Sequence, residues 1–89
     1  MNNFDISFIF NKRTYQASVR KEPGSPVTYY ASIHDPHDLN IKNAIPFIAQ
    51  RGTEMLGWIR IHEYPELTVT IASAITEYCS RNHIELFKG

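Results

Sequence analysis

PELTVTIASAITEYCSRN, residues 65–82, is the stretch that decides the fold. Its apolar side chains recur at helical spacing along one stripe, formed by Leu67, Ile71, Ala74, Ile75 and Tyr78. Pro65 suits the first position of a helix, and Glu66 lies where the helix dipole favours a negative charge. Because its β-branched residues make this helix weak in isolation, the stripe must pack against a hydrophobic sheet.

The residues upstream supply that sheet, since apolar and polar side chains alternate there as in strands with one buried face. Residues 4–10 and 14–20 form the clearest pair, and the polar residues between them are typical of a turn. A two-residue loop at Lys12-Arg13, or a four-residue loop with the same pairing, joins them. The predicted partners are Phe10 and Tyr15, Phe8 and Ala17, Ile6 and Val19, and Asp5 and Arg20.

Two further strands follow, with a less certain segment between them. After a loop at 21–26, residues 27–34 form a third strand with Val27 opposite Val19 and Tyr29 opposite Ala17. Pro46 lies within residues 41–50, which favours an edge or distorted strand there, although a short helix at 39–44 is an alternative. Residues 55–62 alternate again and predict another strand.

The sequence therefore predicts an α+β fold: an antiparallel sheet of four to five meandering strands with one C-terminal helix packed on one face, a two-layer sandwich. A length of 89 residues suits one domain, residues 1–89. A curled sheet that closes towards a small barrel is the structural alternative. The predicted core consists of Phe4, Ile6, Phe8, Tyr15, Ala17, Val19, Val27, Tyr29, Ala31, Ile33, Ile59, Ile61, Leu67, Ile71, Ala74, Ile75 and Tyr78.

Composition narrows the function classes. Hydrophobic residues make up 43% and charged residues 20%, as in soluble globular proteins. Nine basic and nine acidic residues give a net charge of zero, which argues against a nucleic-acid partner and mildly favours self-association. The lone Cys79 is predicted to be a small buried hydrophobe. With neither a secretory signal nor a membrane span, we expect a cytoplasmic protein, although a mature secreted form would look the same.

Two groups of residues are candidates for a site. The outward face of the predicted sheet carries aromatic and apolar side chains with basic neighbours, which is typical of a partner surface; its predicted binding residues are Tyr30, Leu56, Trp58 and Arg60. The alternative is that residues 39–50 fold back over Trp58 and bury it. The second group is a divalent-metal site formed by His34, His37 and His62, although their spacing matches no known zinc motif.

No sequence motif indicates catalysis. A nucleophile elbow is absent, and the four glycines form no phosphate-binding loop. The sequence thus favours a protein that is not an enzyme, and we expect no cofactor. The leading hypothesis is an interaction or structural module that forms a homodimer, or joins an assembly, through its aromatic sheet face or an edge strand. The alternative is a small-molecule or divalent-metal-binding protein that uses the loop His34–Asp38.

Overall fold

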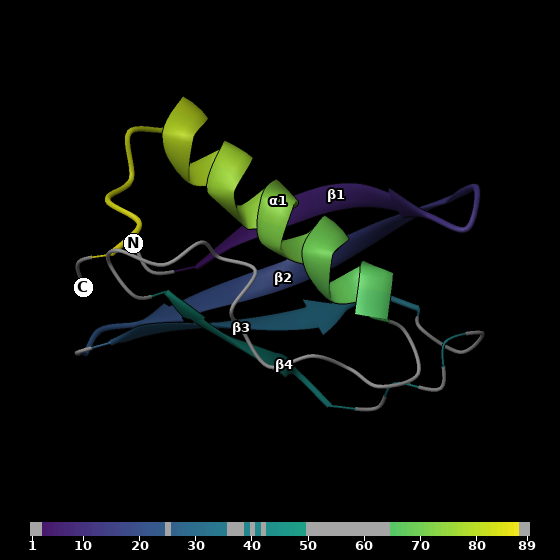
Figure 1. The fold of residues 1–89 in the computed structure, drawn as a ribbon, viewed down its shortest axis with the longest axis horizontal. Coiled ribbons are helices and arrows are strands. Elements are labelled where there is room, and N and C mark those ends of the chain that lie inside the picture. The colour runs from purple at the N-terminus through teal and green to yellow at the C-terminus, as the bar shows by residue number, and fades with distance from the viewer. Residues whose placement is uncertain are drawn as a thin grey trace.

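The alternating segments form one antiparallel sheet in the computed structural model, which describes residues 3–24, 26–35, 39, 41, 43–49 and 65–87. Its strands, in chain order and also in spatial order, are β1 (Asn3–Phe10), β2 (Arg13–Glu22), β3 (Val27–Ile33) and β4 (Ile45–Ala49). Helix α1 (Pro65–Arg81) runs across one face of the sheet and contacts β1 (Figure 1). The predicted α+β arrangement is therefore confirmed.

The turn between β1 and β2 lies at Asn11-Lys12, one residue earlier than the predicted Lys12-Arg13. Its two residues have φ angles of 52° and 63°, which is the geometry of a type I′ hairpin turn. Asparagine adopts this left-handed conformation more readily than most residues, so Asn11 favours the observed turn. The pairs that replace the predicted ones are Phe8 with Tyr15, Ile6 with Ala17, Phe4 with Val19, and Asp5 with Ser18.

The predicted pairing between β2 and β3 is wrong as well. β2 continues to Glu22, whereas the sequence placed residues 21–26 in a loop. Because β2 is longer, each of its residues pairs with a residue four positions further along β3 than predicted. The pairs that replace the predicted ones are Val19 with Ala31, Ala17 with Ile33, and Lys21 with Tyr29. Both corrections shift a strand by an even number of residues, so the predicted inward side chains still face the core.

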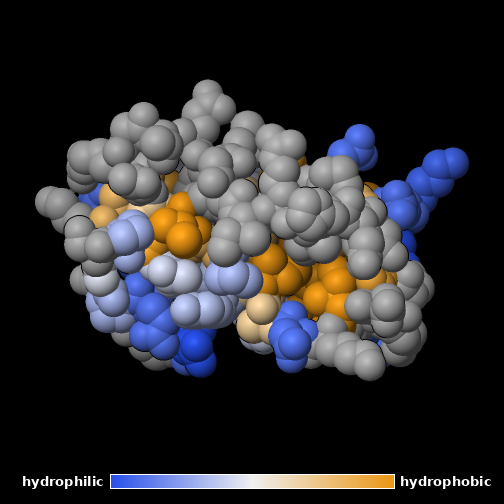
Figure 2. All heavy atoms as spheres, turned by 60° about the horizontal axis from the view of Figure 1, so that its bottom comes forward, coloured by the Kyte–Doolittle hydropathy of each residue, from blue (hydrophilic) through white to orange (hydrophobic). Residues whose placement is uncertain are grey.

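The uncertain segment forms strand β4, and Pro46 lies inside it, opposite Tyr30. A proline cannot donate to a ladder hydrogen bond, so it is tolerated at the edge of a sheet, and β4 is the last strand in the described order. None of the described residues between 39 and 44 is helical. Figure 2 brings the β4 side of the molecule forward and shows hydrophobic residues gathered in the middle of it. The predicted strand at 55–62, with core residues Ile59 and Ile61, lies outside the described residues.

The core lies between α1 and the inner face of the sheet. Leu67, Ile71 and Ile75 of the predicted stripe are fully buried. Ala74 and Tyr78, also predicted to be core residues, are only half-buried, because the helix turns Thr68, Ala72 and Cys79 inward in their place. The prediction that Cys79 is buried is confirmed. Besides Cys79, the buried hydrophobic residues that were not in the predicted core are Phe10, Leu39, Ile45, Phe47, Ala49 and Ala72, and the buried polar residues are Lys21 and Thr68.

Helix α1 ends one residue before the predicted Asn82, in a Schellman-type cap. His83 adopts a φ of 55°, and the N–H of Ile84 donates to the carbonyl oxygen of Cys79 at 2.8 Å. The chain then turns back onto the sheet, where two buried side chains of β2 and β3 bind its backbone. Lys21 Nζ donates to the Glu85 carbonyl oxygen, and the Tyr29 hydroxyl donates to that of Leu86 at 2.7 Å.

Candidate functional site

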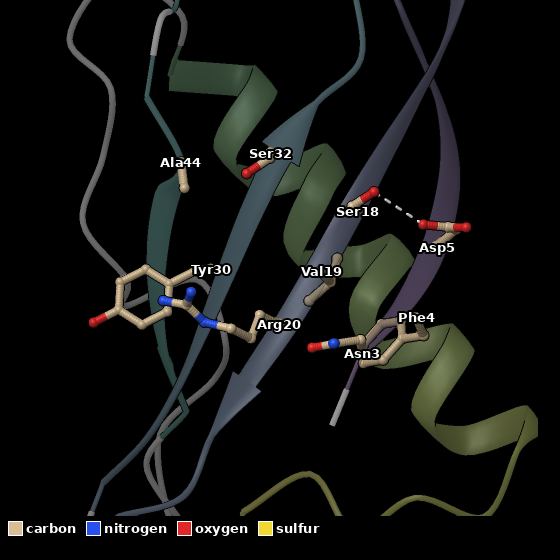
Figure 3. A pocket seen from close by; sticks show the side chains of 9 residues that line it. All are labelled: Asn3, Phe4, Asp5, Ser18, Val19, Arg20, Tyr30, Ser32 and Ala44. Atoms are coloured by element: carbon tan, nitrogen blue, oxygen red, sulfur yellow. Dashed lines mark hydrogen bonds between the residues drawn. The ribbon is translucent and has the colours of Figure 1, made fainter. Parts of the chain in front are cut away.

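The face of the sheet opposite α1, here called the outer face, carries the polar half of the alternating pattern. Figure 3 views the sheet from this side, with α1 behind it. Most of its side chains are small and polar, and its one exposed large hydrophobic residue among those described is Ile9, at 68%. The outer-face residues of the first three strands are Asn3, Asp5, Ser7, Ile9, Thr14, Gln16, Ser18, Arg20, Glu22, Thr28, Tyr30 and Ser32.

A chain of hydrogen bonds crosses this face from β1 to the end of β3. The Ser18 hydroxyl donates to Asp5 Oδ1 at 3.1 Å and lies 2.8 Å from His34 Nε2. Because Ser18 gives its only proton to the carboxylate, it accepts the second bond, which requires a proton on Nε2 of His34. In this arrangement His34 donates to Ser18 and does not act as a base towards it.

Beside this chain, the Arg20 guanidinium lies over the Tyr30 ring, 4.9 Å from its centroid. Arg20 Nε also pairs with Glu22 Oε1 at 3.0 Å. An open hollow of about 410 Å³ lies against these strands, and Figure 3 shows Arg20 reaching from β2 across to Tyr30. Its polar lining offers a cation, a carboxylate, an amide and hydroxyl groups, which suits hydrogen bonding to a polar partner. The lining residues are Asn3, Phe4, Asp5, Ser18, Val19, Arg20, Tyr30, Ser32 and Ala44.

Of the predicted binding residues, the structure places only Tyr30, which is half-buried on the outer face as expected. Leu56, Trp58 and Arg60 lie outside the described residues. The predicted aromatic surface is therefore represented by one of its four members. The exposed Ile9 of β1 lies on the same face.

Of the predicted metal ligands, the structure places His34, whose Nε2 is engaged with Ser18. His37 and His62 lie outside the described residues. In the part of the chain that the structure describes, no group of three or more His, Cys, Asp or Glu side chains could hold a metal ion.

The free edge of β1 is a feature that the sequence did not single out. In the described sheet β1 is an outermost strand and pairs only with β2. It has eight residues, contains neither proline nor glycine, and carries one charge, on Asp5. The opposite edge strand, β4, has only five residues and contains Pro46. Natural sheets protect their edges with short strands, prolines and lysines, and β1 has none of these.

A groove of about 240 Å³ runs along the same edge, between β1 and α1. Its helical wall includes Glu77 and Arg81, which form an ion pair at 2.8 Å. The half-buried Ala74 and Tyr78 also line it, so the two helix residues that are less buried than predicted both face this edge. The lining residues are Asp5, Ile6, Ser7, Ala74, Glu77, Tyr78 and Arg81.

Lys21, Tyr29 and Cys79 form a polar cluster inside the core. Burial raises the pKa of the Cys79 thiol and, together with Cys79 and Glu85, raises the pKa of Tyr29. Cys79 is thus held as a thiol, which is the unreactive form. Since Lys21 and Tyr29 bind the backbone of residues 85 and 86, this cluster holds the C-terminal segment in place.

No protein-family model, curated protein or solved structure matches this chain. Within the described ranges, every helix falls short of the length and hydrophobicity needed to cross a membrane.

Proposed function

We propose that this protein is a non-enzymatic interaction module that self-associates by pairing β1 with the β1 strand of a second copy. The observation that carries this proposal is that β1, a regular eight-residue strand with one charge and no proline, is an outermost strand of the described sheet. Such an edge presents unpaired backbone donors and acceptors that a second strand can satisfy. The contrast with β4, which is shorter and contains Pro46, supports β1 as the edge that is used.

The electrostatic and chemical properties of the chain support the same proposal. A net charge of zero provides no general repulsion between copies. Ser18 lies in a hydrogen-bond chain that does not activate it, and Cys79 is a buried thiol with a raised pKa. A cytoplasmic location is part of the proposal, since a reducing compartment keeps a single thiol such as Cys79 free.

The backbone geometry identifies a substitution that tests this edge alone. The His34 N–H donates to the Gln16 carbonyl oxygen, so the backbone of Gln16 is directed to β3 and not to β1. Ser7 lies opposite Gln16, and because pairs alternate between bonded and non-bonded, the Ser7 N–H points to the free edge. Ser7→Pro therefore removes a donor at this edge while leaving the ladder with β2 intact.

The experiment is the solution mass by light scattering over a range of concentrations, for the wild type, Ser7→Pro and the control Ser7→Ala. We expect a dimer for the wild type and for Ser7→Ala, which keeps the N–H. Ser7→Pro loses one bond at each of two symmetric sites, and at ~0.5–1.5 kcal/mol each its dissociation constant rises by roughly 5- to 150-fold. Far-UV circular dichroism checks that the variant is folded.

Other outcomes would redirect or end the proposal. A wild type that is monomeric at every concentration would contradict it. A Ser7→Pro variant that dimerises as well as the wild type would also contradict it, and would point to the outer face. Trp58→Ala tests that second surface, whose predicted members are Tyr30, Leu56, Trp58 and Arg60.

A further inference from the structure

The pairing of β1 with β2 determines which backbone groups of β1 are free. Phe10 and Arg13 flank the two-residue turn, so they form a hydrogen-bonded pair, and such pairs recur at every second residue along the ladder. Phe4, Ile6 and Phe8 are therefore bonded to β2. The residues whose N–H and C=O groups point to the free edge are Asn3, Asp5, Ser7 and Ile9.

We infer that two copies pair their β1 strands antiparallel about a two-fold axis at Ile6, an inference that rests on the proposed function. This register sets Asn3 opposite Ile9 and Asp5 opposite Ser7 of the second copy, so all the outward-pointing residues of both strands form hydrogen-bonded pairs. Ile6 then faces its own copy in the non-bonded pair at the axis. The two sheets become one continuous sheet with both helices on the same face.

Neighbouring registers are less favourable. An axis at Ser7 moves Asn3 opposite Asn11, which belongs to the turn and not to the strand. An axis at Asp5 sets the two Asp5 carboxylates directly opposite each other, and like charges in that position are destabilising. In the register centred on Ile6, each Asp5 instead faces a Ser7 hydroxyl that can donate to it.

The groove along the edge supports the same arrangement. It places Ile6 beside the part of α1 that carries Ala74, Glu77 and Arg81, so a two-fold axis at Ile6 brings the corresponding parts of the two helices towards each other. Related antiparallel by that axis, Glu77 of each helix can approach Arg81 of the other, which is charge complementarity across a self-complementary surface. A second copy would also cover Ala74 and Tyr78, which the monomer leaves half-buried.

The arrangement also assigns a role to Ile9, which is 68% exposed in the single chain. In the dimer, Ile9 of one copy lies opposite Asn3 of the other, and Asn3 lines the hollow on the outer face. The second copy thus contributes an apolar residue beside a polar hollow. Burial of Ile9 at the junction removes an exposed hydrophobic side chain from water.

The sign of one charge effect distinguishes the registers. In the inferred register, Ser7→Lys places each new ammonium opposite Asp5 of the second copy, and two cross-strand pairs at ~0.2–1 kcal/mol each lower the dissociation constant by roughly 2- to 30-fold. With the axis at Ser7, the two lysines face each other and the dissociation constant rises instead. Gln16→Lys adds the same charge one strand further in, opposite Ser7 of its own chain and away from the β1 strand of the second copy, and is the matched control.

The measurement is the dimer dissociation constant of the wild type, Ser7→Lys and Gln16→Lys at low ionic strength, by sedimentation equilibrium. A tighter Ser7→Lys dimer, against an unchanged Gln16→Lys dimer, is expected. A weaker or unchanged Ser7→Lys dimer overturns the register while the proposed self-association stands, whereas a wild-type monomer overturns both. As a second test, the Asp5→Cys and Ser7→Cys variants are mixed and oxidised. Disulfides that link one variant to the other should outnumber disulfides between two copies of the same variant, because Asp5 and Ser7 lie opposite each other in this register. An excess of the Ser7→Cys homodimer overturns the register.

Discussion

Removal of the Tyr29 hydroxyl should change the pH dependence of stability in a direction that the structure defines. Burial raises the pKa of Tyr29 above its ordinary value of 10.0, so the folded protein keeps the hydroxyl neutral while the unfolded chain ionises. The stability that this group contributes is therefore complete below about pH 10 and is lost as the pH rises above it. At pH 11 the loss of stability reaches about 1.4 kcal/mol, because the unfolded chain releases one proton that the folded protein keeps and pH 11 is one unit above the ordinary pKa.

The Tyr29→Phe variant should show two opposite effects. At neutral pH it loses the 2.7 Å bond to the Leu86 carbonyl oxygen, and it should be less stable than the wild type by ~0.5–1.5 kcal/mol. Above about pH 10 the variant has no hydroxyl to ionise, so it escapes the alkaline loss. The difference in the free energy of unfolding between the two proteins should therefore vanish by about pH 11 or reverse, with the variant more stable by up to about 1 kcal/mol.

Urea unfolding followed by far-UV circular dichroism at pH 7, 9, 10 and 11 measures this difference, at one protein concentration so that self-association is constant. Ser18→Ala is the matched control, because it also removes a hydroxyl hydrogen bond but on the exposed outer face. Its difference from the wild type should stay constant above pH 8. A Tyr29→Phe difference that stays constant or grows between pH 9 and 11 would refute the assignment of Tyr29 as a buried neutral hydroxyl.

Two further predictions follow from the turn and from the histidine loop. Lys12→Gly should stabilise the hairpin by ~0.5–1 kcal/mol in urea unfolding, because Lys12 adopts a φ of 63° that glycine accepts without strain; Lys12→Val should have the opposite effect, and an equal response to both would argue against a type I′ turn. Zn²⁺ or Mn²⁺ should leave the melting temperature unchanged, because no three His, Cys, Asp or Glu side chains among the described residues could hold a metal ion and His34 Nε2 is hydrogen-bonded to Ser18; a rise in melting temperature that His34→Ala abolishes would support the metal-binding alternative.

Alternation along the chain was sufficient to predict the faces of the sheet but not its registers. The burial of Phe4, Phe8 and Tyr15 follows from a period of two, and a shift by two or four residues leaves that pattern unchanged. What fixed the first register was the backbone conformation of Asn11 and Lys12. The helix was predicted almost to the residue, since Pro65 and the apolar stripe mark it clearly, although its rotation about its own axis was not.

The candidate site was predicted only in part, for a related reason. The position of Tyr30 on the outer face follows from alternation within one strand. The exposure of β1 as an edge, by contrast, depends on the order of all the strands, which no single segment of sequence encodes. Lys21 illustrates the same limit. The sequence placed it in the loop at residues 21–26, yet it lies in β2 and is buried, because its ammonium group binds the returning C-terminal segment.

Pro46 has a consequence for how far any assembly of this chain can grow. Two copies joined through β1 would leave a β4 strand at each outer end of the described sheet, and each of those strands carries a proline. A proline there withholds a donor from any further strand, so addition of a third copy is disfavoured. A chain whose sheet has one blocked edge, β4, and one open edge, β1, stops growing once two copies have paired. A chain with two open edges could instead polymerise into fibres.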